Sequence, residues 1–111
     1  MSNKIFDSEK MQLLGTFFMN STDGIYIVDK NGRVLLANPS ILEYLGASYE
    51  ELVGIKLDSI IQSGVYRGSP VLETIRTKKV FTGLVKARNG AEIMSTSKPI
   101  FNERGELELV I

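Results

Sequence analysis

The chain has 111 residues, of which 43% are hydrophobic and 23% charged, and its 13 Lys and Arg balance 13 Asp and Glu. This composition is typical of a single globular domain, and the lack of net charge argues against nucleic acid or an anionic membrane as a partner. Because the chain contains no Cys and no His, disulfides, thiolate metal sites, Cys nucleophiles and the commonest general base are all excluded.

No apolar run is long enough to span a membrane, and the first residues lack the pattern of a signal peptide. We therefore expect a cytoplasmic protein without a membrane partner. Residues 1–8 are predicted to form a flexible lead-in to the domain.

Residues 9–20 are predicted to form an amphipathic helix, which Asp7 or Ser8 can cap. Its apolar stripe recurs at helical spacing and consists of Met11, Leu14, Phe17 and Phe18. This stripe can pack on the sheet of its own domain or form the interface of a homodimer, and we favour the homodimer.

A β-hairpin is predicted next, with strands over 24–28 and 33–37 joined by a polar turn over 29–32. Asn38 follows as a helix N-cap, and Pro39 suits the first helical position because its missing N–H costs nothing there.

Short helices occupy the middle of the chain. One is predicted over 39–46, closed by a C-cap glycine, and a Ser-x-x-Glu capping box starts another over 48–54. A brief helical segment over 55–61 leads to a polar loop over 62–68, and a Ser-Pro start opens a helix over 69–79.

Three strands connected by tight turns are predicted at the end of the chain, over 80–87, 91–100 and 106–111. Pro99 is expected to mark the end of its strand, because it cannot donate to a ladder. Helices that are segregated from strands joined by hairpins indicate an α+β domain with one antiparallel sheet.

The chain resembles the PAS sensor domains over about 9–111. The resemblance rests on the order and spacing of Asp23-Gly24-Ile25, Asp29-Lys30-Asn31-Gly32, Asn38-Pro39, the segment 49–54, Asn89-Gly90 and the segment 99–105. It implies a five-stranded sheet of order 2-1-5-4-3, short helices on one face, often a bound small molecule, and an N-terminal helix that commonly mediates dimerisation.

Finer details are similar to the N-terminal PAS sensors of bacterial sigma-54-dependent transcriptional regulators. They are the sequence Asp23-Gly24-Ile25-Tyr26 and the glycine-containing loop Ser63-Gly64-Val65. The final strand lacks the polar residues of a natural terminus, so we expect a sensor excised from a longer regulator.

A pocket is expected between the sheet and the helices, although a filled core is an equal alternative. The candidate lining residues are Ile27, Leu35, Asn38, Leu42, Leu52, Ile60, Tyr66, Arg67, Leu72, Ile75, Ser95 and Ser97.

Several of these candidates have a simpler interpretation. Asn38 is favoured as a helix cap over a ligand contact. Arg67 can bind a carboxylate or phosphate, but a solvated loop arginine is commoner. Ser95 and Ser97 share one face of their strand, and if that face points inward their hydroxyls need partners such as a polar ligand or water.

Several cofactors of PAS proteins are excluded by the residue types present. Flavin adducts need a Cys and the usual haem sensors need an axial His, and this chain has neither. Non-covalent flavin and haem held by Met or Tyr remain open, and a colourless metabolite is favoured.

The sequence therefore predicts a sensor that binds a small molecule, dimerises, or does both, and that controls a downstream transcription-regulating effector. The alternative is a ligand-free dimerisation or protein-interaction module. An enzyme is not expected, because no nucleophile and base pair, metal cluster or phosphate loop is present.

Overall fold

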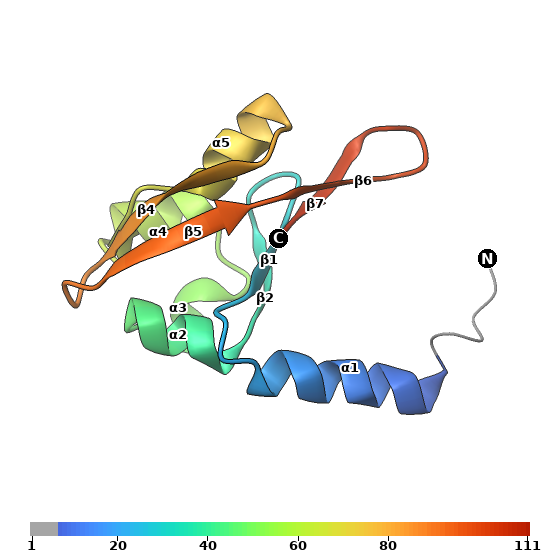
Figure 1. Cartoon of the computed structure of the whole chain (residues 1–111). Helices are drawn as coiled ribbons and strands as arrows, with labels where there is room; N and C mark the ends of the chain where they lie inside the picture. Colours follow the sequence, from blue (N-terminus) through green and yellow to red (C-terminus); the bar gives the residue numbers. More distant parts are fainter. Residues whose placement is uncertain (1–6) are drawn as a thin grey trace.

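The computed structural model describes residues 7–111 and has the predicted α+β architecture. Short helices lie beside antiparallel strands, and a longer helix projects from the domain (Figure 1). The helices are α1 (Ser8–Asn20), α2 (Pro39–Leu45), α3 (Tyr49–Leu52), α4 (Leu57–Gln62) and α5 (Pro70–Thr77). The strands are β1 (Tyr26–Asp29), β2 (Val34–Ala37), β3 (Tyr66–Arg67), β4 (Phe81–Ala87), β5 (Glu92–Ser97), β6 (Pro99–Phe101) and β7 (Leu107–Val110).

The strands form two sheets connected through one continuous segment. One sheet has the order β2-β1-β7-β6 and the other has the order β3-β4-β5. Strand β5 passes into β6 at Lys98, so the strand predicted over 91–100 is divided beside Pro99, which opens β6. When β5 and β6 are counted as that one strand, the predicted order 2-1-5-4-3 is recovered. Strand β3 is an addition, because its segment was expected to be a loop.

Helix α1 stands away from the rest of the domain (Figure 1). Asp7 caps it by accepting a hydrogen bond from the amide of Lys10 at 2.9 Å. Ser8, predicted to belong to the lead-in 1–8, is instead the first helical residue. The prediction for residues 1–6 falls outside the described part of the chain.

The inner face of the first hairpin differs from the predicted one. Val28 and Val34 are fully buried, whereas Ile27 is partly buried and Leu35 is 41% exposed. Side chains alternate along a strand, so burial of Val28 places Tyr26 on the inner side and Ile27 on the outer side. A register shift between Ile27 and Val28 leaves Leu35 outside as well. The prediction that Ile27 and Leu35 line the inner surface of the sheet is therefore wrong.

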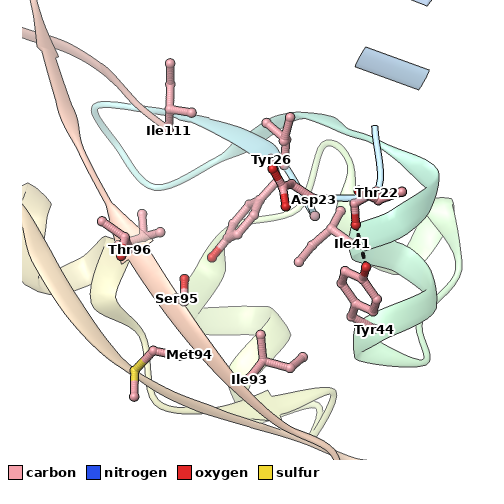
Figure 2. A pocket seen from close by; sticks show the side chains of 13 residues that line it. Thr22, Asp23, Tyr26, Ile41, Tyr44, Ile93, Met94, Ser95, Thr96 and Ile111 are labelled. Atoms are coloured by element: carbon pink, nitrogen blue, oxygen red, sulfur yellow. Dashed lines mark hydrogen bonds between the residues drawn. The ribbon is translucent and has the colours of Figure 1, made fainter. Parts of the chain in front are cut away.

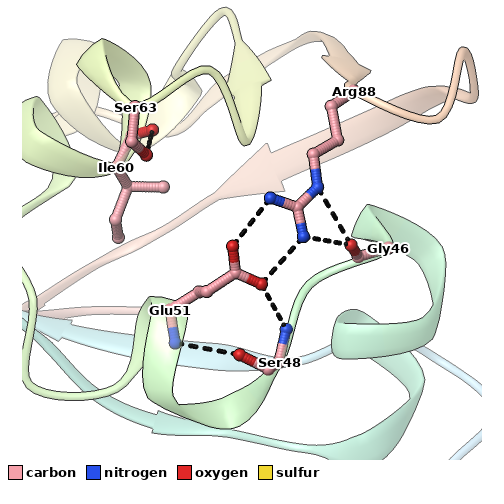
Figure 3. Close-up of polar contacts among 6 residues, drawn as sticks. All are labelled: Gly46, Ser48, Glu51, Ile60, Ser63 and Arg88. Atoms are coloured by element: carbon pink, nitrogen blue, oxygen red, sulfur yellow. Dashed lines mark hydrogen bonds and ion pairs between the residues drawn. The ribbon is translucent and has the colours of Figure 1, made fainter.

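Local capping explains why such short helices form. Ser48 and Glu51 make the predicted capping box of α3, with the amide of Ser48 donating to the Glu51 carboxylate at 2.9 Å. Arg88 donates two further bonds to this carboxylate, at 2.7 and 2.8 Å, and also bonds the carbonyl of Gly46 (Figure 3). These bonds tie the turn after β4 to the corner between α2 and α3. They also hold the pKa of Glu51 at about 2, mainly through Arg88.

The core fills the space between the helices and the inner faces of the strands. Leu45, Leu52, Leu57 and Ile60 from the helices are each no more than 2% exposed. They belong to the same buried cluster as Val28, Val34, Val85 and Val110 from the strands. This close packing fixes the positions of β1, α2 and β5, which surround the cavity described next.

Candidate functional site

A cavity of about 330 Å³ lies between the start of β1, helix α2 and strand β5 (Figure 2). A smaller space of about 20 Å³, the inner recess, shares Tyr26, Ile41, Ile93 and Ser95 with it. The cavity is lined by Thr22, Asp23, Gly24, Ile25, Tyr26, Ile41, Tyr44, Val71, Ile93, Met94, Ser95, Thr96 and Ile111. The inner recess adds Leu45, Tyr66 and Val85.

The wall of the cavity before β1 is held against α2 by close packing and by one side-chain hydrogen bond. A Cβ atom on Gly24 would approach the Cα of Ile41 to 3.1 Å, so glycine lets the chain before β1 run this near α2 without displacing it. The hydroxyl of Tyr44 donates to the carbonyl of Thr22, which anchors the same segment to the helix (Figure 2).

Neutral hydroxyl groups supply the polar chemistry of the site. The ring of Tyr26 reaches from β1 towards Ser95 on β5 (Figure 2). Burial raises the pKa of Tyr26 to about 12. Burial and the facing Tyr26 phenol together raise the pKa of Tyr66 further. Both phenols therefore stay protonated at neutral pH, and each can donate a hydrogen bond.

Tyr66 is 2% exposed, and its hydroxyl has no partner with hydrogen-bonding geometry, although the phenol of Tyr26 is near. A buried polar group without a partner is costly, and most such groups in proteins are satisfied. The inner recess beside Tyr66 has room for about one water-sized group. The Tyr66 hydroxyl is thus available to a polar atom that enters the recess.

Ser95 and Ser97 both lie on the inner face of β5. Ser95 lines the cavity and the inner recess. Ser97 is 1% exposed, and its hydroxyl also lacks a partner, but it lies against α5, where the Thr74 hydroxyl donates to its carbonyl at 3.3 Å. Ser97 therefore lines neither space.

Most of the predicted pocket residues belong to a filled core. Leu52 and Ile60 are each 1% exposed, and Leu42, Leu72 and Ile75 pack against the same cluster. None of them lines the cavity or the inner recess. Space remains at the β1 and β5 end of the domain instead, because the helices cover the other end closely.

Asn38 occupies the corner between β2 and α2, away from the cavity. It is completely buried, and all four hydrogen-bonding positions of its amide are used within the protein. The amide caps α2 and fastens the end of α1 and the segment before β1 to that corner. No position remains for a ligand.

Arg67 is exposed on β3, directly opposite Lys86 on β4. Its side chain does not line the cavity or the inner recess. The structure thus places its side chain at the surface, outside the cavity and the inner recess.

The lining residues that sequence reasoning did not identify come mainly from three places: the segment before β1, helix α2 and the edge of β5. Tyr26 carries the most chemistry among them. Its even spacing from Val28 places the two residues on one face of the strand, but the spacing does not show which face is buried, because Ile27 makes the other face apolar as well. Met94 and Thr96 also line the cavity, but the sequence did not predict this, since their side chains point to the opposite face from Ser95.

Helix α1 exposes the stripe that was predicted for dimerisation. Met11 is 55% exposed, Leu14 48% and Phe17 67%, while Phe18 is partly buried next to the domain. The described part of the helix contains no buried residue. Apolar surface of this extent on a folded domain commonly marks an interaction site.

Two other kinds of site are absent from residues 7–111. Within that range no helix is long and apolar enough to cross a membrane. The same range contains no group of acidic side chains that could hold a metal ion.

Comparison with known proteins gives a consistent result. A search of curated proteins returned no match. Among solved structures, the chain is similar to the PAS domain of BvgS from Bordetella pertussis, with a TM-score of 0.61 and 17% identity over 93% of this chain and 82% of that one. It is also similar to a domain of a sensory box sensor histidine kinase/response regulator from Geobacter sulfurreducens, with a TM-score of 0.63 and 18% identity over 96% of both chains.

A third similar structure is the PAS domain of nitrogen regulation protein NR(II) from Vibrio parahaemolyticus, with a TM-score of 0.59 and 19% identity over 88% of this chain and 94% of that one. At these identities the structures establish the fold. The family model for the PAS domain matches residues 22–111, which is most of the sequence. The chain therefore belongs to the PAS domain family.

Proposed function

We propose that this PAS domain senses a small, neutral molecule that binds in the cavity and places one polar atom in the inner recess. The observation that carries the proposal is the buried hydroxyl of Tyr66, which has no partner and borders the recess. Tyr26 and Ser95 offer two more hydroxyls at the same place. A carbonyl or hydroxyl oxygen of a ligand placed there would give the Tyr66 hydroxyl the partner that it lacks.

The lining favours a neutral ligand over an anion. The only charged side chain among the described lining residues is that of Asp23, which is exposed at the rim. An anion would find no cation there, and both phenols stay protonated. The volume of about 330 Å³ is at the lower end of the range of small-molecule sites.

Native mass spectrometry of the purified domain, compared with its denatured mass, tests for a co-purifying molecule, and a thermal-shift library of neutral metabolites extends the search. With a ligand in hand, Tyr66→Phe should weaken its binding roughly fivefold to tenfold, the loss of one hydrogen bond. Tyr49→Phe, on an exposed residue of α3, should leave binding unchanged. No bound mass together with no thermal shift would defeat the proposal.

A second function has its own observation, the exposed stripe of α1. We propose that the domain self-associates by burying Met11, Leu14 and Phe17 against a second copy. On size-exclusion chromatography Phe17→Asp should convert a dimer to a monomer. Gln12→Asp adds the same charge to the same helix outside the stripe and should leave the dimer intact. A dimer that survives Phe17→Asp would exclude this helix as the interface.

We also propose that the domain is the sensor of a longer cytoplasmic, sigma-54-dependent bacterial regulator and controls its transcription-regulating effector. The motifs Asp23-Gly24-Ile25-Tyr26 and Ser63-Gly64-Val65 support this assignment. So does the similarity to the PAS domain of a nitrogen regulation protein and to a domain of a sensory box sensor histidine kinase/response regulator. Sequencing the gene on both sides of this region tests it, and a gene encoding no effector would refute it.

A further inference from the structure

A groove of about 450 Å³ lies on the surface beside β3 and β4, and we call it the basic groove. It shares no lining residue with the cavity described above. The groove is therefore a separate feature that the sensing proposal does not use. Its lining includes Gly64, Arg67, Lys86, Arg88, Gly90 and Glu92.

Two glycines keep the basic groove open. Gly64 lies in the turn between α4 and β3, and Gly90 lies in the turn between β4 and β5. A Cβ atom on either residue would meet no atom within 4 Å. Because both turns leave this space unfilled, side chains of a partner can enter the groove from either turn.

The charges of the groove form a row across three strands. Arg67 on β3 lies directly opposite Lys86 on β4, and Lys86 lies directly opposite Glu92 on β5. All three side chains are exposed, and none belongs to an ion pair within residues 7–111. Lys86 thus has an acidic neighbour on one side, whereas Arg67 has only a like charge opposite it. Like charges directly opposite each other destabilise a sheet.

One carboxylate can neutralise both cations of this pair. The amide of Arg88 donates to the carbonyl of Val65 at 2.9 Å. The pair two residues further along, Arg67 with Lys86, is therefore hydrogen-bonded as well, with Cα atoms about 5.5 Å apart. Arg67 can bind a carboxylate through its planar fork of donors, and Lys86 adds a compact positive charge.

The remaining donors near the groove are already used. The guanidinium of Arg88 bonds Glu51 and the carbonyl of Gly46 (Figure 3). The backbone amides of Gly64, Arg88 and Gly90 donate to carbonyls within the domain at 3.0, 2.9 and 3.0 Å. Phosphate sites are commonly built from free backbone N–H groups, so the groove suits a carboxylate better than a phosphate.

We propose that the basic groove docks an extended segment of a partner protein, with an acidic side chain seated between Arg67 and Lys86. The segment crosses the strands and presents a basic side chain to Glu92. The distance along the row from the middle of the Arg67 and Lys86 pair to Glu92 is one and a half strand spacings, or roughly 7 Å. Alternate residues of an extended chain are separated by about the same distance. The structure thus favours an acidic residue two positions from a basic one.

Selection of random short peptides displayed on phage against the purified domain tests this proposal. Peptides with an acidic residue two positions from a basic one should be enriched. An enriched peptide is then synthesised, and its affinity is measured by isothermal titration calorimetry. Absence of this pattern among the selected peptides would overturn the proposal.

Two charge reversals locate the binding site. Arg67→Glu should weaken binding of the selected peptide about tenfold, because it replaces an attraction with a repulsion. It also places an acid opposite Lys86, so the variant should melt no lower than the wild type. Lys79→Glu makes the same change in net charge at an exposed residue outside the groove and should leave the affinity unchanged.

The outcomes separate the groove from its alternatives. Equal weakening by Arg67→Glu and Lys79→Glu would mean that only net charge matters, which would overturn the groove as the docking site. Displacement of the peptide by inorganic phosphate, compared with NaCl at the same ionic strength, would identify a small phosphate ligand as the occupant instead of a protein segment.

Discussion

Replacing Asn38 with alanine should destabilise the domain strongly, because one buried amide connects α1, β1 and α2. The Oδ1 atom of Asn38 accepts hydrogen bonds from the amides of Ile25 at 2.9 Å and Ile41 at 3.1 Å. Its Nδ2 atom donates to the carbonyls of Phe18 at 3.1 Å and Asp23 at 2.9 Å. All four bonds are lost together when the side chain is shortened to a methyl group.

The magnitude follows from what alanine leaves behind. Each of the four hydrogen bonds contributes about 1 kcal/mol net. The bond from the Ile41 amide is the cap of α2, and the loss of such a cap costs about 1 kcal/mol by itself. Asn38 is fully buried, so water cannot readily replace these bonds. We therefore expect a loss of about 4 kcal/mol, a large part of the roughly 5–15 kcal/mol that stabilises a domain.

Urea unfolding followed by far-ultraviolet circular dichroism measures this loss, with Asn102→Ala as the matched control. The Asn102 side chain also accepts two backbone hydrogen bonds, from Arg104 at 2.9 Å and Glu106 at 3.0 Å, but in a surface turn where water can substitute. The control should lose about 1 kcal/mol. If Asn38→Ala loses no more free energy of unfolding than Asn102→Ala, burial of the Asn38 amide does not determine its contribution to stability.

Two further predictions concern a glycine and an ion pair. Gly68→Ala should cost more than about 3 kcal/mol, because Gly68 has a φ of +81° and a Cβ atom there would lie 2.5 Å from the carbonyl oxygen of Leu84. Gly64 has a similar φ of +83°, but a Cβ atom there would meet no atom within 4 Å, so Gly64→Ala should lower the free energy of unfolding by only roughly 1–2 kcal/mol. Equal losses for the two variants would refute the contribution of the clash with Leu84. Because Arg88 lowers the pKa of Glu51 from 4.5 to about 2, the stability advantage of the wild type over Glu51→Gln should be complete above pH 4.5 and decline as the pH falls towards 2. An advantage that does not change with pH in urea titrations over this interval would contradict the role of the carboxylate.

The helix starts could be predicted from the sequence because capping depends on neighbouring residues. Asn38 with Pro39, and Ser48 with Glu51, contain in four residues or fewer all the groups that their caps need. The inner face of β1 could not be predicted in the same way. Large apolar side chains occupy both faces of that strand, with Ile27 on one and Tyr26 on the other, so its alternation carries no difference in polarity.

The position of the cavity was beyond sequence reasoning for a different reason. It depends on how β1, β5 and β7 are placed side by side, and the pairing of β1 with β7 at Val28 and Val110 joins segments far apart in the chain. The predicted lining residues Leu52 and Ile60 are correctly placed beneath the helices, but the helices pack there without leaving space. Ser95 was predicted because Ile93, Ser95 and Ser97 share one face of β5, and the structure shows that this face points inward.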